Sequence, residues 1–167
     1  MEETTLSLVI AVAALLISSV TFFMWYTKKE KRAGETPFNI RPLQLQAYER
    51  LVILTERIAL PNLVSRANQP GLSAKEMQLL MLESIKQEFD YNSSQQLYVS
   101  PVAWQAVSNL KEQNMLIINQ VAHTLPAEAK GTDLGKKIIE LLMTHDKKAL
   151  HNIVLEALNY EARKLMK

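Results

Sequence analysis

The chain has 167 residues, of which 48% are hydrophobic and 22% are charged, and its formal net charge is +2 at pH 7. It contains no cysteine, which excludes disulfide bonds, thiolate metal sites and a cysteine nucleophile. The positive charge is too small and too scattered to argue for nucleic-acid binding by itself, and only four glycines are present for building a backbone cradle around phosphate.

The first predicted element is a membrane-spanning helix over residues 5–26, a stretch without a charged side chain. At about 1.5 Å per residue this helix would be roughly 33 Å long, enough to cross a hydrocarbon core of about 30 Å. Residues 1–4 contain no Lys or Arg, whereas the predicted juxtamembrane linker, residues 27–41, contains four basic side chains near its start: Lys28, Lys29, Lys31 and Arg32. Basic flanks stay in the cytoplasm. We therefore predict residues 1–4 outside and everything after the span inside.

One face of the predicted span carries only small side chains, at alternating spacings of four and three residues: Ser7, Ala11, Ala14, Ser18 and Thr21. A stripe of this kind lets a second membrane helix approach closely, which favours packing against a protein partner. Alanine and serine are also common in spans that serve only as anchors. Both interpretations stay open.

Residues 42–167 are predicted to form a cytoplasmic helical domain. Its first helix should run from about Pro42 to about Leu60, just before Pro61, with a connection following over residues 61–72. The pairs Glu49-Arg50 and Glu56-Arg57 repeat seven residues apart on the polar side of this helix. We interpret that side as a solvated face rather than a docking surface.

Two later helices have clear start signals. Ser73, with Glu76 three residues on, has the pattern of a capping box, and the methionines that follow are interpreted as core filler. This helix should weaken over residues 90–94, although it could continue to Tyr98. Ser100 followed by Pro101 predicts the start of a helix that reaches His123 or Leu125.

The helix after Pro101 has a seam with coiled-coil-like spacing that includes one asparagine: Ala103, Val107, Leu110, Asn114, Ile117 and Val121. A buried asparagine can fix the register between helices, and packing within the domain is the default. Further helices are predicted over about residues 133–145, capped by Thr132, and about residues 147–165. The fold class is therefore all-α: one membrane helix followed by a bundle of about five helices.

Catalytic signatures are missing from the sequence. It has no phosphate-binding loop, no nucleophile elbow and no His-Glu-x-x-His pair. The three histidines, His123, His145 and His151, are interpreted as surface or helix-end residues. No cofactor and no metal site are predicted.

Two motifs carry a resemblance to a known family. Residues 45–51 read Leu-Gln-Ala-Tyr-Glu-Arg-Leu, and residues 95–101 read Gln-Gln-Leu-Tyr-Val-Ser-Pro and are followed by Trp104. With these motifs the chain resembles a family of short single-pass membrane proteins from Bacteroidota, known as a domain of unknown function. Thr55 departs from the aliphatic residue expected there. The resemblance implies a bacterial inner-membrane location and a helical cytoplasmic domain, and it implies no activity and no site.

The motif residues allow two interpretations. Tyr98, Val99 and Trp104 surround the helix start at Ser100, so we expect them to brace the turn between two helices. Alternatively, four motif side chains form an exposed patch that docks a partner: Tyr48, Arg50, Tyr98 and Trp104.

The function expected from these features is a membrane-anchored, non-enzymatic interaction or accessory subunit of a membrane-associated protein assembly. One alternative is an accessory that binds RNA or the ribosome beside a membrane channel, which predicts salt-sensitive binding. Another is an enzyme whose histidine and glutamate residues come together only on folding.

Overall fold

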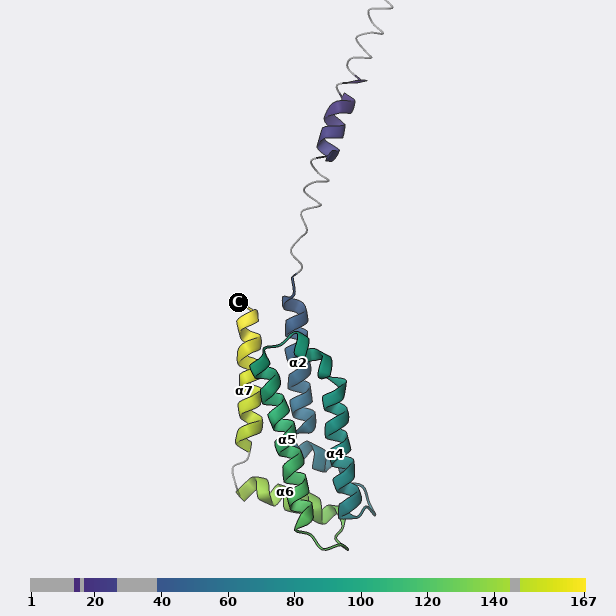
Figure 1. Cartoon of the computed structure of the whole chain (residues 1–167), viewed down its shortest axis with the longest axis vertical. Helices are drawn as coiled ribbons and strands as arrows, with labels where there is room; N and C mark the ends of the chain where they lie inside the picture. Colours follow the sequence, from purple (N-terminus) through teal and green to yellow (C-terminus); the bar gives the residue numbers. More distant parts are fainter. Residues whose placement is uncertain (1–13, 16, 27–38, 145–147) are drawn as a thin grey trace, which may run out of the picture. The chain divides into compact units, whose positions relative to one another are not determined.

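The computed structural model describes residues 14–15, 17–26, 39–144 and 148–167 (Figure 1). By compactness the chain divides into two units, Met1–Asn39 and Ile40–Lys167. Among the helices of the described ranges, none combines the length and the apolar character that crossing a bilayer needs. Residues 5–13 and 16 of the predicted span lie outside these ranges, so the span stays a prediction.

The first unit is helical at residues 14–15 and 17–26. Ala14, Ser18 and Thr21 of the small-residue stripe are exposed. The Thr21 hydroxyl shares its one hydrogen between the carbonyl oxygens of Ile17 at 3.0 Å and Ser18 at 2.9 Å, so its donor is engaged within its own helix. The remaining predicted partner-face and juxtamembrane residues lie outside the described ranges: Ser7, Ala11, Lys28, Lys29, Lys31 and Arg32.

In the second unit the described residues form six α-helices, one 3₁₀ helix and no strand, which confirms the all-α class. The elements are α2 (Arg41–Ile58), α3 (Leu60–Ala67), α4 (Ala74–Tyr91), η1 (Ser93–Leu97), α5 (Pro101–His123), α6 (Gly131–Thr144) and α7 (Lys148–Leu165).

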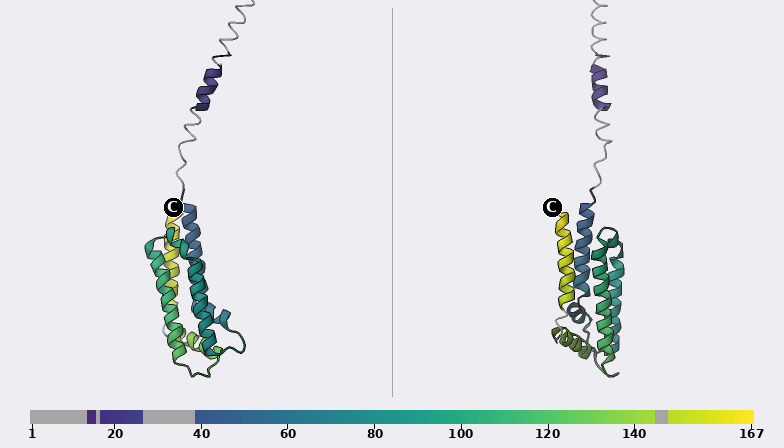
Figure 2. Two further views of the ribbon diagram at one scale, coloured as in Figure 1. Left: turned by 45° about the vertical axis from the view of Figure 1, so that its right-hand side comes forward. Right: turned by 60° about the vertical axis from the view of Figure 1, so that its left-hand side comes forward.

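The four long helices, α2, α4, α5 and α7, lie side by side in a bundle and alternate in direction along the chain (Figures 1 and 2). Helix α2 packs between α7 and α4, and α5 packs against both α4 and α7. We call the end that holds the start of α2, η1 and the end of α7 the proximal end. Helices α3 and α6 lie at the opposite, distal end, where α6 runs across the bundle.

Helix α3 corrects the expected connection over residues 61–72. Helix α2 ends at Ile58, Ala59 has an extended backbone with ψ of 129°, and a new helix begins at Leu60. Interpreting Pro61 as a stop was wrong, because a proline in a first helical turn has no intrahelical N–H bond to lose. The new helix buries three apolar residues at helical spacing: Leu60, Leu63 and Ala67.

The two predicted helix starts are confirmed. The Ser73 hydroxyl accepts the Glu76 N–H at 3.2 Å and the Glu76 carboxylate accepts the Ser73 N–H at 2.9 Å, which completes a capping box. The Ser100 hydroxyl accepts the Ala103 N–H at 3.0 Å, and Pro101 is the first residue of α5. Helix α4 ends at Tyr91 and gives way to η1, in line with the expected weakening.

The six seam residues of α5 are all buried. Asn114, the polar member, donates its amide Nδ2 to the carbonyl oxygen of Ile58 at 2.8 Å. This bond satisfies a carbonyl at the end of α2, where the chain breaks into α3. The asparagine therefore fixes α5 against α2 within the domain.

At the distal end, α6 begins earlier than predicted. It starts at Gly131, and the exposed Thr132 lies inside its first turn instead of capping it. The N–H of Gly131 donates to the Leu72 carbonyl at 2.8 Å, in a short antiparallel bridge that joins the starts of α4 and α6. A Cβ at Gly135 would lie 2.9 Å from Val64 Cγ1. Glycine is needed there because α6 approaches α3 closely.

Candidate docking groove between α2 and α4

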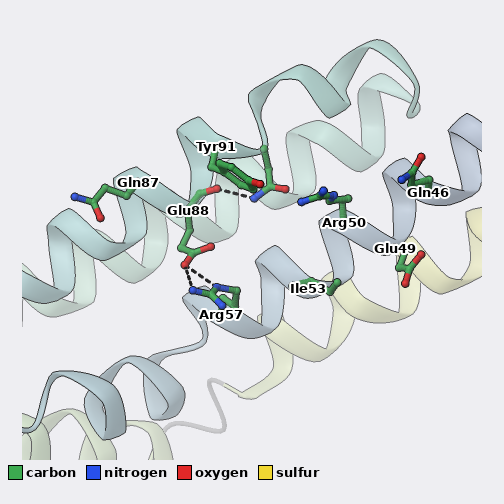
Figure 3. Close-up of a pocket in the computed structure, with 9 residues that line it drawn as sticks. Gln46, Glu49, Arg50, Ile53, Arg57, Gln87, Glu88 and Tyr91 are labelled. Carbon is green, nitrogen blue, oxygen red and sulfur yellow. Dashed lines mark hydrogen bonds and ion pairs between the residues drawn. The ribbon is translucent and has the colours of Figure 1, made fainter.

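The surface between α2 and α4 contains an open groove of about 560 Å³ (Figure 3). Side chains from both helices and the residue that ends α4 line it: Gln46, Glu49, Arg50, Ile53, Arg57, Gln87, Glu88, Tyr91 and Asn92. The α2 residues recur at helical spacing, so one stripe of that helix forms one wall.

An ion pair closes one end of the groove. The Arg57 guanidinium donates its Nε–H to Glu88 Oε1 at 2.6 Å, and its Nη2 contacts the same oxygen. The hydrogen bond to Glu88, together with the attraction of that carboxylate, raises the pKa of Arg57. The negative charge of Glu88 is therefore already matched before any partner binds.

Arg50 presents a second guanidinium near the other end. Its Cζ lies 5.7 Å from the centroid of the Tyr91 ring, a distance at which a cation is attracted to the aromatic face. In Figure 3 the Arg50 side chain extends toward Tyr91, whereas Glu49 points away from α4. Between the two arginines Ile53 is about half exposed. The groove thus offers a positioned cation next to an apolar surface.

This arrangement is suited to binding rather than to bond making. The lining includes no serine, cysteine or histidine that could act as a nucleophile or proton carrier near neutral pH. In the part of the chain that the structure describes, no three His, Asp or Glu side chains come together in a way that could hold a metal ion. The predictions of no metal and no enzymatic activity remain predictions.

Tyr48 corrects the expected exposed patch, because its side chain is only 5% exposed. Its phenol donates to Glu161 Oε2 on α7 and accepts the Ser100 N–H at 3.1 Å. The Ser100 hydroxyl donates to the same carboxylate oxygen at 2.5 Å. The tyrosine therefore joins α2, α5 and α7 at the proximal end and is not available to a docking partner.

The Tyr48 network should make stability fall at high pH. Burial, and then the bond to Glu161, raises the phenol pKa above its ordinary value of 10.0, so the folded state holds this proton more tightly than the unfolded state. The stability that the Tyr48 phenol contributes to the folded state is fully present below pH 10.0 and is lost as the pH rises through the folded-state pKa of this phenol. Urea unfolding on both sides of this pH should show a steeper loss for the native chain than for Tyr48→Phe.

The exposed Tyr160 provides the matched control for this experiment, since Tyr160→Phe should leave the pH dependence of the native chain unchanged. Equal losses for the native chain and Tyr48→Phe would contradict the role given to the phenol.

Trp104 and Tyr98, unlike Arg50, are not among the residues that line the groove. Trp104 is half-buried on α5 and packs against Phe89 of α4, with ring centroids 4.9 Å apart. Tyr98 is half-buried at the end of η1, where its N–H donates to the Gln95 carbonyl at 3.0 Å. These contacts agree with bracing of the α4–α5 turn. A docking role for Arg50, Tyr98 and Trp104 stays a prediction.

A comparison with protein-family models identifies the chain's relatives. The model described as "Family of unknown function (DUF7935)" matches residues 3–165. The chain belongs to this family. No curated protein and no solved structure matches it. The resemblance carried by the two motifs is thus confirmed as membership of a family of unknown function. The inner-membrane and Bacteroidota parts of that resemblance stay predictions.

One wall of the groove is apparent in the sequence of this DUF7935 member. Arg50 and Arg57 lie seven residues apart, a repeat that by itself indicates only a solvated helix face. The opposite wall, with Glu88 and Tyr91, gave no signal, because its position depends on which helix packs beside α2.

A smaller groove of about 360 Å³ lies between α5 and α6 of the DUF7935 domain. It is lined by Gln120, Val121, Thr124, Lys137, Glu140, Leu141 and Thr144. Its one cation and one carboxylate lie one turn apart on α6, and no aromatic ring positions either of them. The α2–α4 groove is therefore the stronger candidate for recognition.

Proposed function

We propose that this chain is a membrane-anchored, non-enzymatic docking subunit of a protein assembly, and that its α2–α4 groove binds a segment of a partner protein. The observation that carries the proposal is the Arg50 guanidinium placed over Tyr91 beside the exposed Ile53.

The chemistry of the groove specifies the partner segment. A guanidinium held near an aromatic face still has N–H groups available for other partners, and the planar arrangement of these groups matches a carboxylate. Ile53 supplies an apolar contact close to it. Because Arg57 already neutralises Glu88, a second carboxylate is directed to Arg50. The expected ligand is a peptide segment in which an Asp or Glu lies next to an apolar side chain.

The membrane part of the proposal rests on the amino-terminal sequence. Residues 5–26 are uncharged and are followed by four basic residues within six positions. The family match begins at residue 3, so it includes the residues of the predicted span. A docking groove tethered at the membrane would hold its partner beside the bilayer.

The test is affinity isolation of the full chain from native membranes in mild detergent, followed by quantitative mass spectrometry. Arg50→Glu reverses the charge that faces the partner, so the recovery of a groove-bound protein should fall about tenfold, which corresponds to about 1.4 kcal/mol. Lys136→Glu is the matched control, because Lys136 is an exposed cation on α6 and is not part of the groove lining.

A second variant tests the span. Replacing Ser7, Ala11, Ala14 and Ser18 with leucine should remove partners that pack on the small-residue stripe and leave groove-bound partners in place. Recovery of the chain alone from every preparation would contradict the docking proposal. Equal recovery of the same partners with Arg50→Glu would exclude the groove as their binding site.

A further inference from the structure

The proximal end of the bundle exposes an unusual set of large apolar side chains. Leu97 on η1, Val102 at the start of α5 and both Tyr160 and Met166 near the chain's end are between 63% and 75% exposed. Leu97 is the last residue of the short 3₁₀ helix η1, which lies between the end of α4 and the start of α5. Apolar side chains at the tip of a bundle cannot contribute to its core, and here they belong to separate elements that meet at one end.

Cations accompany these apolar tips. Arg163, Lys164 and Lys167 are all exposed at the end of α7, and Lys164 Nζ lies 4.2 Å from the centroid of the Tyr160 ring. Carboxylates near the same end are Glu161, which is engaged by the Tyr48 phenol and the Ser100 hydroxyl, Glu49, which is exposed beside Tyr48, and Asp90, which is exposed near the end of α4. Together with the exposed Arg41 and Arg50 on α2, the cations outnumber these carboxylates, so the net charge of this end is positive.

The predicted membrane segment is joined along the chain to the helix that begins at this end. Helix α2 begins at the proximal end with Arg41, the last residue of the predicted basic linker, residues 27–41. If residues 5–26 cross the bilayer, the linker restricts how far the start of α2 can lie from the headgroups. The distal end, with α3 and α6, is the full length of the bundle away from that start.

We infer that the proximal end of the bundle rests on an anionic membrane surface, with Leu97, Val102 and Met166 in the interface and the α7 cations at the headgroups. The inference rests on the membrane anchoring proposed above. Lysine and arginine near an anionic leaflet are attracted to it, and exposed apolar side chains of a surface-bound protein enter the headgroup boundary. Long basic side chains can also keep their charge at the headgroups while their stems cover apolar surface.

The absence of cysteine permits a direct test with the full chain. Leu97→Cys, Met166→Cys and Met143→Cys are each labelled with an environment-sensitive fluorophore and reconstituted into nanodiscs of phosphatidylcholine, with or without phosphatidylglycerol. Met143 is the control, because it is 78% exposed and lies on α6 at the distal end. In anionic discs the emission from positions 97 and 166 should shift to shorter wavelength, and that from position 143 should not.

A charge variant separates surface contact from anchoring. Combining Arg163→Glu, Lys164→Glu and Lys167→Glu should abolish the shift at position 97 while the chain still copurifies with the discs. Unshifted emission at positions 97 and 166 in a chain that is integrated would overturn the inference and leave the anchor proposal standing. A shift of equal size at position 143 would also overturn it. A chain that does not enter the discs at all would overturn both proposals.

Discussion

Replacing Leu158 with alanine is expected to lower the free energy of unfolding by about 2–5 kcal/mol, the range for truncating a fully buried leucine. Leu158 lies in the core on α7, the helix that packs against both α2 and α5. The loss combines the transfer free energy of the deleted atoms with the cavity left behind. The two neighbouring long helices, α2 and α5, limit the collapse of that cavity, so the upper half of the range is expected.

Chemical unfolding of the purified chain, followed by far-UV circular dichroism, measures this change. Ile153→Ala on the same helix is the matched control, because Ile153 is mostly exposed and its truncation should cost less than about 1 kcal/mol. If both variants unfolded at the same denaturant concentration, α7 would not be packed in the core as described.

Asn114→Leu is expected to cost about 1–3 kcal/mol, although it replaces a buried polar side chain with an apolar one of similar size. The reason is the Ile58 carbonyl, which receives the Asn114 amide at 2.8 Å and would remain buried without a donor. A leucine cannot replace that donor. The Ile58 carbonyl, at the break between α2 and α3, would thereby lose its hydrogen bond to the Asn114 side chain.

Two further substitutions on α5 test this explanation by the same unfolding experiment. Asn114→Asp keeps the shape of the side chain but sets a carboxylate against a carbonyl oxygen, so it should destabilise at least as much as Asn114→Leu. Asn109→Leu, at an exposed position of the same helix, should change the free energy of unfolding by less than about 0.5 kcal/mol. A harmless Asn114→Leu would mean that the Ile58 carbonyl finds another donor.

The core, rather than the groove's ion pair, determines the shape of the groove. The Arg57 side chain is 52% exposed, and pairs of this kind typically contribute about 0.2–1 kcal/mol. Core residues on α2 and α4, among them Leu51, Leu54, Met81 and Ile85, set the separation of the two walls. The consequence of the Arg57–Glu88 pair is therefore electrostatic, because it leaves Arg50 as the cation that faces a partner.

Local patterns in the sequence were enough to predict the five longer helices of the second unit, α2, α4, α5, α6 and α7, and two of their starts. The capping box at Ser73 and the hydroxyl cap at Ser100 use hydrogen bonds between residues three positions apart, so neither depends on the rest of the fold. The buried seam of α5 follows from helical periodicity in the same way, which is also why the all-α class could be predicted.

Tertiary structure decided the features that join distant residues. Asn114 reaches the Ile58 carbonyl across 56 positions, Glu88 meets Arg57 across 31, and Glu161 meets Tyr48 across 113. Each pairing depends on which helices become neighbours, and helical periodicity identifies a buried face without naming the helix that covers it. For that reason the break before α3, the second wall of the groove and the burial of Tyr48 emerged only when the helices packed together.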